Sequence, residues 1–181
     1  MCADAALPEV DDLIGPGLRL LFVGINPSLL SSRTGLHFAH PGNRFYPALV
    51  EAGILPVHAS DAAAAAPELL RRGVGISNLV PRATARADEL SAEEIRAGRA
   101  RVAERVARHR PRVVAIAGIT AYRTAFAAPR AVAGPQPDGI EGARLWVVPN
   151  PSGLNAHATV ASLGRDYRAA AEAAGLALER P

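Results

Sequence analysis

Four short apolar runs alternate with amphipathic segments along this chain. The runs are residues 18–25, 74–80, 112–118 and 143–150. Each has the length of a buried strand, and the segments between them mix apolar and charged positions as helices do. Strands that alternate with helices form parallel sheets covered on both faces. The pattern predicts an α/β fold, a three-layer sandwich around a central, mostly parallel, four-stranded sheet.

Helix start and stop signals delimit the segments between the runs. Ser91 and Glu94 form a capping box, and Gly73 ends the helix that precedes it. The predicted helices cover residues 43–52, 61–72, 91–108, 119–126 and 159–174. The Gly/Pro-rich stretch 134–139 predicts a surface turn.

The N-terminal composition sets the expected domain boundary. Residues 1–17 are acidic and end in Gly-Pro-Gly, which predicts a loose lead-in before a single domain at 18–181. No run reaches the roughly 18 uncharged apolar residues that a membrane span needs, and a signal peptide would begin with basic residues. We therefore expect a cytoplasmic protein with no membrane partner.

The basic residues change this picture because all 20 of them are Arg. Arg suits bidentate contact with phosphate, so a pI near 9.7 fits a polyanionic partner. For the composition alone, the codon bias of a GC-rich genome is the better explanation. Without Lys, no side chain can form a Schiff base with a sugar. The single cysteine, Cys2, excludes an internal disulfide or a thiolate cluster. We expect no cofactor.

Two polar loops follow apolar runs with related sequences. They are GINPS at 24–28 and PNPSG at 149–153. The first continues to residue 46, a length that is uncommon in a compact domain unless the loop is functional. Ligands of parallel sheets bind beyond the carboxyl ends of the strands. We expect the two loops to form the ligand site together.

Common catalytic and metal motifs are absent from the sequence. It lacks GxxxxGK[ST], a GxGxxG after the first strand, and GxSxG. Its histidines lack metal-ligand spacing, and ordinary hydrogen bonds are the simpler expectation for His37 and His40. An Asn amide can still hold a water molecule, which is useful where a leaving group departs early, as in cleavage of an N-glycosidic bond.

The long motifs GINPSLLSSRTGLHFAHPGNRFY and VVPNPSGLNA, with NLVPRAT between them, resemble one known family. It is the mismatch-specific uracil/thymine DNA glycosylase branch of the uracil-DNA glycosylase superfamily. The resemblance implies a monomeric, monofunctional glycosylase that flips uracil out of duplex DNA at G:U mismatches and hydrolyses its N-glycosidic bond without a metal. Thymine opposite guanine is a second candidate substrate.

The resemblance also implies site residues. Asn26 would position the attacking water, and the base would be contacted by Phe38, Ser31, Asn150 and Ile25. The loop that enters the duplex would contain Ser152, Gly153, Leu154 and Asn155. In that loop Leu154 would fill the space left by the flipped base, and Ser152 would contact phosphate near a helix start.

Each role has a structural alternative. Asn26 and Asn150 would form Asx turns before proline, Phe38 would anchor its loop, and Leu154 would be a hydrophobic staple of the last helix. Asp88 is a second candidate catalytic residue, because a carboxylate over the site would polarise the water. Its alternative is that it or a neighbour caps the helix near Ser91.

Two other functions stay open. One is a non-catalytic module that binds lesions or mismatches in DNA with the same fold. The other is an enzyme acting on free nucleosides, which would have little use for Leu154 or a basic surface.

Overall fold

The computed structural model describes residues 7–179, and Cys2 lies outside this range. Its sheet has the strand order β2-β1-β3-β5-β4, with β4 antiparallel to β5 and the other pairs parallel. The strands are β1 (Leu20–Gly24), β2 (Val74–Asn78), β3 (Val113–Ala117), β4 (Gly134–Ile140) and β5 (Ala143–Val148). The α/β prediction is confirmed, with five strands where four were expected.

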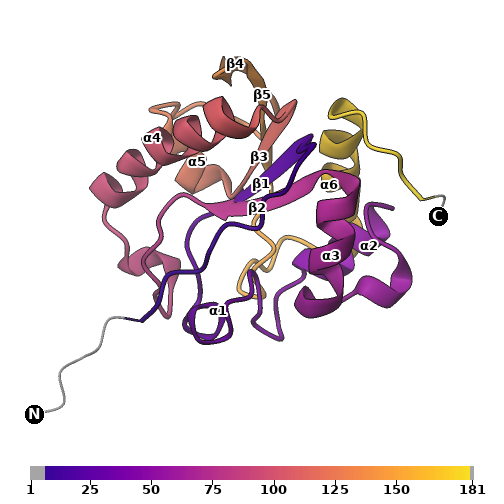
Figure 1. The fold of residues 1–181 in the computed structure, drawn as a ribbon. Coiled ribbons are helices and arrows are strands. Elements are labelled where there is room, and N and C mark those ends of the chain that lie inside the picture. Colours follow the sequence, from indigo (N-terminus) through magenta and orange to yellow (C-terminus); the bar gives the residue numbers. More distant parts are fainter. Residues whose placement is uncertain (1–6, 180–181) are drawn as a thin grey trace, which may run out of the picture.

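Helices cover both faces of this sheet (Figure 1). One face packs on α2 (Phe45–Glu51), α3 (Ala62–Arg72) and α6 (Val160–Ala173), and the other on α4 (Ala92–His109) and α5 (Ile119–Ala125). Two apolar clusters result, one on each side of β1 and β3, whose side chains alternate between them. Both central strands are buried along their whole length. The described residues contain no helix that is long and apolar enough to cross a membrane.

The fifth strand, β4, replaces the surface turn predicted at 134–139. This stretch pairs with β5 through Gly134–Val147 and again through Ile140–Ala143, with a register shift between Pro135 and Gly139. Proline is compatible with a strand at the edge of a sheet, where one side of the backbone lacks a partner. The Pro- and Gly-rich composition therefore indicated an edge strand with a bulge, and the turn prediction was wrong.

The lead-in is also bound more tightly than expected in its described part, residues 7–17. Leu13 forms an antiparallel bridge with Ile76 of β2. The Asp12 carboxylate accepts a hydrogen bond from Ser77 Oγ at 2.6 Å and forms an ion pair with Arg105 of α4. Asp12, one of the acidic residues that suggested a loose tail, thus accepts a hydrogen bond and forms an ion pair that together hold the lead-in on the domain.

Most of the predicted helix ends are confirmed. The capping box of Ser91 and Glu94 opens α4, and Asp61 caps α3, which ends at Gly73 in the left-handed conformation. The sequence did not predict α1 (Leu29–Thr34), which lies inside the long loop after β1 and is capped by Ser28. That loop is therefore partly helical.

Candidate active site

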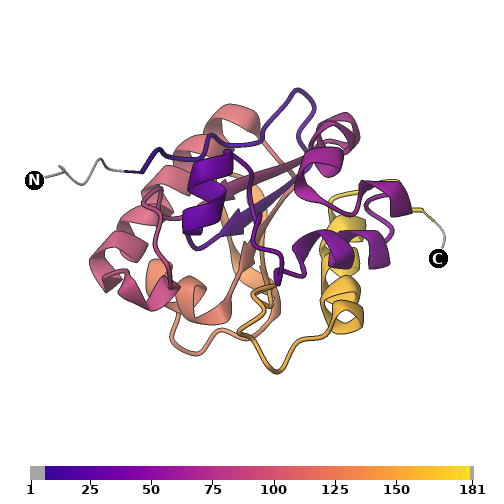
Figure 2. The same ribbon diagram turned by 90° about the horizontal axis from the view of Figure 1, so that it is seen from below.

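The carboxyl ends of β1, β3 and β5 bring the two Asn-Pro loops to one edge of the sheet. Gly118, directly after β3, lies between them: a Cβ atom there would be 3.5 Å from Ile25 Cδ1 and 3.9 Å from Asn150 Cβ. In Figure 1 this edge is the lower one, where α1 and the loop before α6 are found, and Figure 2 looks onto it. The expected meeting of the two loops is present in the structure.

Asn26 has a fixed side-chain orientation. Its Nδ2 group donates hydrogen bonds to the main-chain oxygen of Arg82 and to Thr84 Oγ1, both at 2.8 Å. Because a main-chain carbonyl can only accept, the atom facing Arg82 must be the amide nitrogen. Both amide protons are thus used, and Asn26 Oδ1 has no hydrogen-bond partner within residues 7–179. The site offers an acceptor there, as positioning of a water requires.

The two residues that accept hydrogen bonds from Asn26, Arg82 and Thr84, belong to the NLVPRAT loop. Neighbouring residues and α4 hold them in place. Thr84 Oγ1 donates to the oxygen of Arg86 at 2.7 Å, and its backbone pairs with Ser28. The Arg82 guanidinium donates to both carboxylate oxygens of Glu94, at 2.8 and 3.1 Å. This pairing, together with the capping bond from Ser91, lowers the pKa of Glu94 to about 2. The start of α4 therefore supports Asn26 through Arg82.

Phe38 has the anchoring contact that the structural alternative predicts. Its ring stacks on Phe45, with centroids 4.1 Å apart, so the anchoring alternative is correct. It is nevertheless only half-buried, and a base could stack on the ring area that is still accessible. Its backbone is left-handed, with φ of 51°, and the missing side chain of Gly24 makes room for the ring edge.

A buried polar pair lies beside Phe38. His37 is 6% exposed, with Nε2 2.9 Å from the oxygen of Asp11 and Nδ1 3.3 Å from Asn78 Nδ2. Since Nε2 must donate to that carbonyl, Nδ1 accepts from Asn78 and the ring is neutral. Burial lowers the pKa of His37, which is consistent with this state. His37 makes ordinary hydrogen bonds, as expected.

Asn150 has the opposite arrangement to Asn26. Its Oδ1 accepts a hydrogen bond from the main-chain nitrogen of Ser152 at 2.9 Å, so the Asx turn of the structural alternative is present. Its Nδ2 group has no partner within the described residues. Asn155 Nδ2 in turn donates to the oxygen of Asn150 at 3.0 Å. Asn150 therefore keeps a free donor that can contact a base.

Leu154 is 85% exposed, so it is not a staple of α6. Gly153 lies against the first loop, because a Cβ atom there would be 2.8 Å from the oxygen of Gly42. Ser152 is not near a helix start, since α6 begins only at Val160. The structure therefore contradicts the staple for Leu154 and the helix-terminal setting for Ser152, and it leaves an exposed apolar side chain at the site edge.

Comparison with known proteins identifies the family. The sequence profile of the Uracil DNA glycosylase superfamily matches residues 12–173 of this chain. The chain belongs to that superfamily. Its fold is similar to the solution NMR structure of a candidate uracil DNA glycosylase from Methanosarcina acetivorans, with a TM-score of 0.62 and 16% identity. The match covers 90% of this chain and 96% of that one.

Family membership supports a DNA glycosylase role, and the two remaining base-contact candidates lie at the site. Ile25 contacts Gly118. Ser31 is 1% exposed, and its hydroxyl oxygen lies 3.0 Å from Ser28 Oγ and accepts from the nitrogen of Ala39 at 3.3 Å. In this superfamily member Ser31 therefore holds the segment around Phe38 and presents little surface to a ligand.

Asp88 makes no hydrogen bond with Asn26 in the described residues. Its carboxylate is 62% exposed and forms an ion pair with Arg86. The predicted capping role belongs to its neighbours, because Glu89 accepts from the nitrogen of Arg86 and Ser91 caps α4. Asp88 lies in the single turn of 3-10 helix at Ala87–Glu89, next to the residues that support the amide of Asn26.

Sequence reasoning missed three residues that build this superfamily site: Asn78, Thr84 and Arg44. Asn78 ends β2 as Asn26 follows β1, and Thr84 lies in the NLVPRAT motif, so each carried a usable signal. Arg44 donates to the second Asn-Pro loop from the start of α2, and only the folded structure shows that contact.

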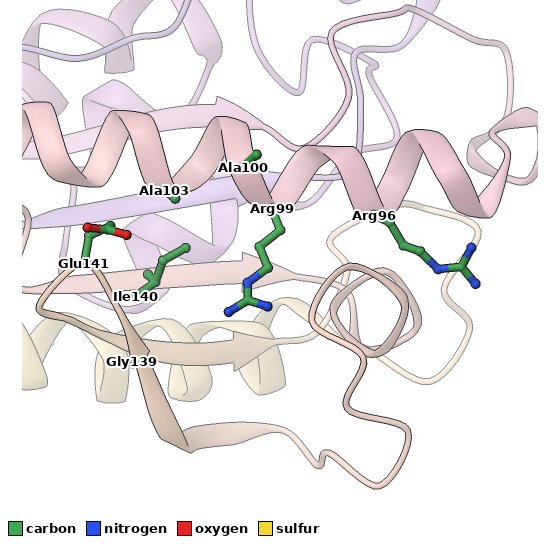
Figure 3. A pocket seen from close by; sticks show the side chains of 7 residues that line it. All are labelled: Arg96, Arg99, Ala100, Ala103, Gly139, Ile140 and Glu141. Carbon is green, nitrogen blue, oxygen red and sulfur yellow. The ribbon is translucent and has the colours of Figure 1, made fainter.

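Two hollows in the described residues lie away from this site. One of about 440 Å³ is found between α4 and the β4–β5 turn, and Figure 3 shows Arg99 reaching from α4 toward it. Gly139, in its lining, pairs with Arg144 at the start of β5, the opposite end from Asn150. Within residues 7–179 no three metal-ligating side chains come together.

Proposed function

We propose that this chain is a monofunctional DNA glycosylase of the mismatch-specific branch, which removes uracil from duplex DNA containing G:U pairs. The observation that carries the proposal is the amide of Asn26, with both protons committed and its oxygen free at the carboxyl edge of the sheet. Membership of the Uracil DNA glycosylase superfamily supports it. The paired Asn-Pro motifs support the finer branch assignment.

In the proposed reaction, uracil leaves the stack, lies against Phe38 and is contacted by Asn150. The C1′–N1 bond breaks, and its electron pair goes to the departing base. A water molecule held by Asn26 Oδ1 adds its oxygen to C1′, and the proton it loses passes to solvent or to the departed base. The products are free uracil and an abasic site. Asn26 acts by orientation, because an amide is a poor base.

Leu154 supports action on duplex DNA. Unstacking a base costs a few kcal/mol, and an apolar side chain that fills the gap offsets part of that cost. At 85% exposed, Leu154 is free to do so. An enzyme for free nucleosides would gain nothing from this side chain, so Leu154→Ala should lower excision from duplex DNA.

The test is single-turnover release of uracil from a duplex with one G:U pair. Release of the base with the DNA strand left intact is expected, since the chain has no Lys to form a Schiff base. Cleavage of the strand by the purified protein would contradict the monofunctional reaction. Tight binding without release would instead favour the non-catalytic binding module.

A further inference from the structure

Arg44, the residue before α2, makes an unusual set of hydrogen bonds. Its guanidinium donates to the main-chain oxygens of Ser152, Asn155 and Ala158, with the bond to Asn155 at 2.8 Å. Its own main-chain nitrogen donates to the oxygen of Pro151 at 3.0 Å. Within residues 7–179 no carboxylate forms an ion pair with Arg44, and its Nε atom is buried without a partner.

The three carbonyl groups belong to two consecutive turns. Asn155 N donates to the oxygen of Ser152 at 3.0 Å, and Ala158 N donates to the oxygen of Asn155 at 3.4 Å. The spacing of three residues puts the three oxygens on one side of the segment, where all three accept hydrogen bonds from the Arg44 guanidinium. Leu154 is exposed between the first two of these residues. The same turns thus have an inner side bound by Arg44 and an exposed apolar side chain.

In the described residues, no residue outside the 150–158 segment except Arg44 forms a hydrogen bond with it. The remaining hydrogen bonds of residues 150–158 within the described chain join members of that segment to each other, as in the bond from Ser152 N to Asn150 Oδ1. Removing the guanidinium would leave the main-chain bond from Arg44 N to the oxygen of Pro151 as the one hydrogen bond that joins this segment to the rest of the described residues. A loop that is already held in its binding conformation loses little conformational entropy on binding, whereas a loosened loop must first become ordered.

We propose that Arg44 is a positioning residue that holds the 150–158 segment so that Leu154 can enter duplex DNA. This inference rests on the proposed function, and it adds to that function a residue that does not touch the reacting atoms. Arg44 acts through Leu154, so the benefit of Leu154 depends on Arg44.

The experiment combines two measurements on Arg44→Met, which keeps the apolar stem and removes the fork of donors. Hydrogen exchange of the free protein should become faster in residues 150–158 and stay unchanged in β1 and β3. Single-turnover excision from a G:U duplex should fall about 10- to 100-fold, the effect expected from a misplaced contact. Arg108→Met is the matched control, because Arg108 is an exposed arginine in the last turn of α4, away from the site, with no side-chain hydrogen bond or ion pair in the described residues.

A double-mutant cycle separates positioning from general destabilisation. If Arg44 acts through Leu154, Arg44→Met should slow excision much less in a Leu154→Ala background than in the wild type. Equal effects in both backgrounds would overturn the proposal, as would unchanged exchange in 150–158. If Arg44→Met does not fold, Arg44→Lys takes its place. A lysine restores the charge without the fork, so wild-type exchange and excision in Arg44→Lys would also overturn it.

Failure of the proposed function would look different. In that case the wild type would release no uracil, while the exchange measurement would still report whether Arg44 fastens the segment. Wild-type release together with an unaffected Arg44→Met variant would contradict the positioning role alone.

Discussion

The two Asn-Pro loops have the same dipeptide after a strand, yet their asparagines present opposite groups. Asn26 commits its Nδ2 protons to Arg82 and Thr84 and keeps Oδ1 free. Asn150 commits Oδ1 to its own Asx turn and keeps Nδ2 free. One loop therefore offers an acceptor, suited to a water, and the other offers a donor, suited to a base carbonyl. Identical residues acquire complementary chemistry from their neighbours.

The loops also differ in how they are attached. The first is fastened by parts of the chain far away in sequence, including the oxygens of Asp11 and Arg82 and the side chain of Asn78. In the second, residues 150–158 form hydrogen bonds to the rest of the described chain through Arg44 alone, besides those within their own turns. A rigid first loop suits bond breaking, and a segment with one external hydrogen-bonding residue suits insertion into DNA.

Loosening the first loop through Thr84 should slow excision more than changing Gly153 or Asp88. Thr84→Val removes one of the two acceptors of the Asn26 amide with little change in shape. Loss of one hydrogen bond of about 1 kcal/mol should slow single-turnover excision roughly 5- to 10-fold, because the free oxygen of Asn26 is no longer aimed. Thr84→Ser keeps the hydroxyl and should retain the wild-type rate. A wild-type rate in Thr84→Val would contradict the claim that this hydrogen bond aims the oxygen of Asn26.

A smaller effect is expected where the loops touch. In Gly153→Ala the added Cβ would lie 2.8 Å from the oxygen of Gly42, so the second loop must shift outward. An exposed segment relaxes easily, and a cost of about 1 kcal/mol predicts roughly 5-fold weaker half-saturation by duplex DNA. The rate at saturation should change less, because Asn26 is not moved. A loss confined to the saturated rate would contradict the assignment of bond breaking to the first loop and of DNA contact to the second.

Asp88→Asn should alter excision by less than about twofold, because an exposed ion pair contributes little and the carboxylate is bound to Arg86. The measurement is the single-turnover rate beside that of Thr84→Val. A large loss in Asp88→Asn would mean that the turn at 87–89 closes over Asn26 when DNA is bound, and the site would then have a second catalytic residue.

The first loop contains a buried histidine whose titration should make the stability of the protein depend on pH near neutrality. Burial lowers the pKa of His37 from 6.5, and Asp12 and the oxygen of Asp11 oppose this only in part. The unfolded chain therefore binds a proton that the folded chain does not, so the free energy of unfolding should fall as pH drops below about 6.5. Urea titration should show a weaker fall in His37→Gln than in the wild type. Equal falls in the two proteins would exclude His37 as the cause.

The sequence predicted the layers and the site edge because these depend on local patterns. Apolar runs, the capping box at Ser91 and the Asn-Pro dipeptides all act over a few residues. It failed where one composition permits two structures: the Pro- and Gly-rich residues 134–139 form an edge strand, and the acidic lead-in pairs with Arg105. The amide orientations of Asn26 and Asn150 and the contacts of Arg44 depend on partners distant in sequence, so no local pattern could supply them.

The most direct test compares Asn26→Ala with Asn150→Ala in single-turnover release of uracil from a G:U duplex, over a range of enzyme concentrations. We predict that Asn26→Ala lowers the saturated rate by about 100-fold or more at unchanged half-saturation. Asn150→Ala should mainly raise the concentration needed for half-saturation. Equal losses of the saturated rate in both variants, or a wild-type rate in Asn26→Ala, would contradict the assignment of different roles to the two loops.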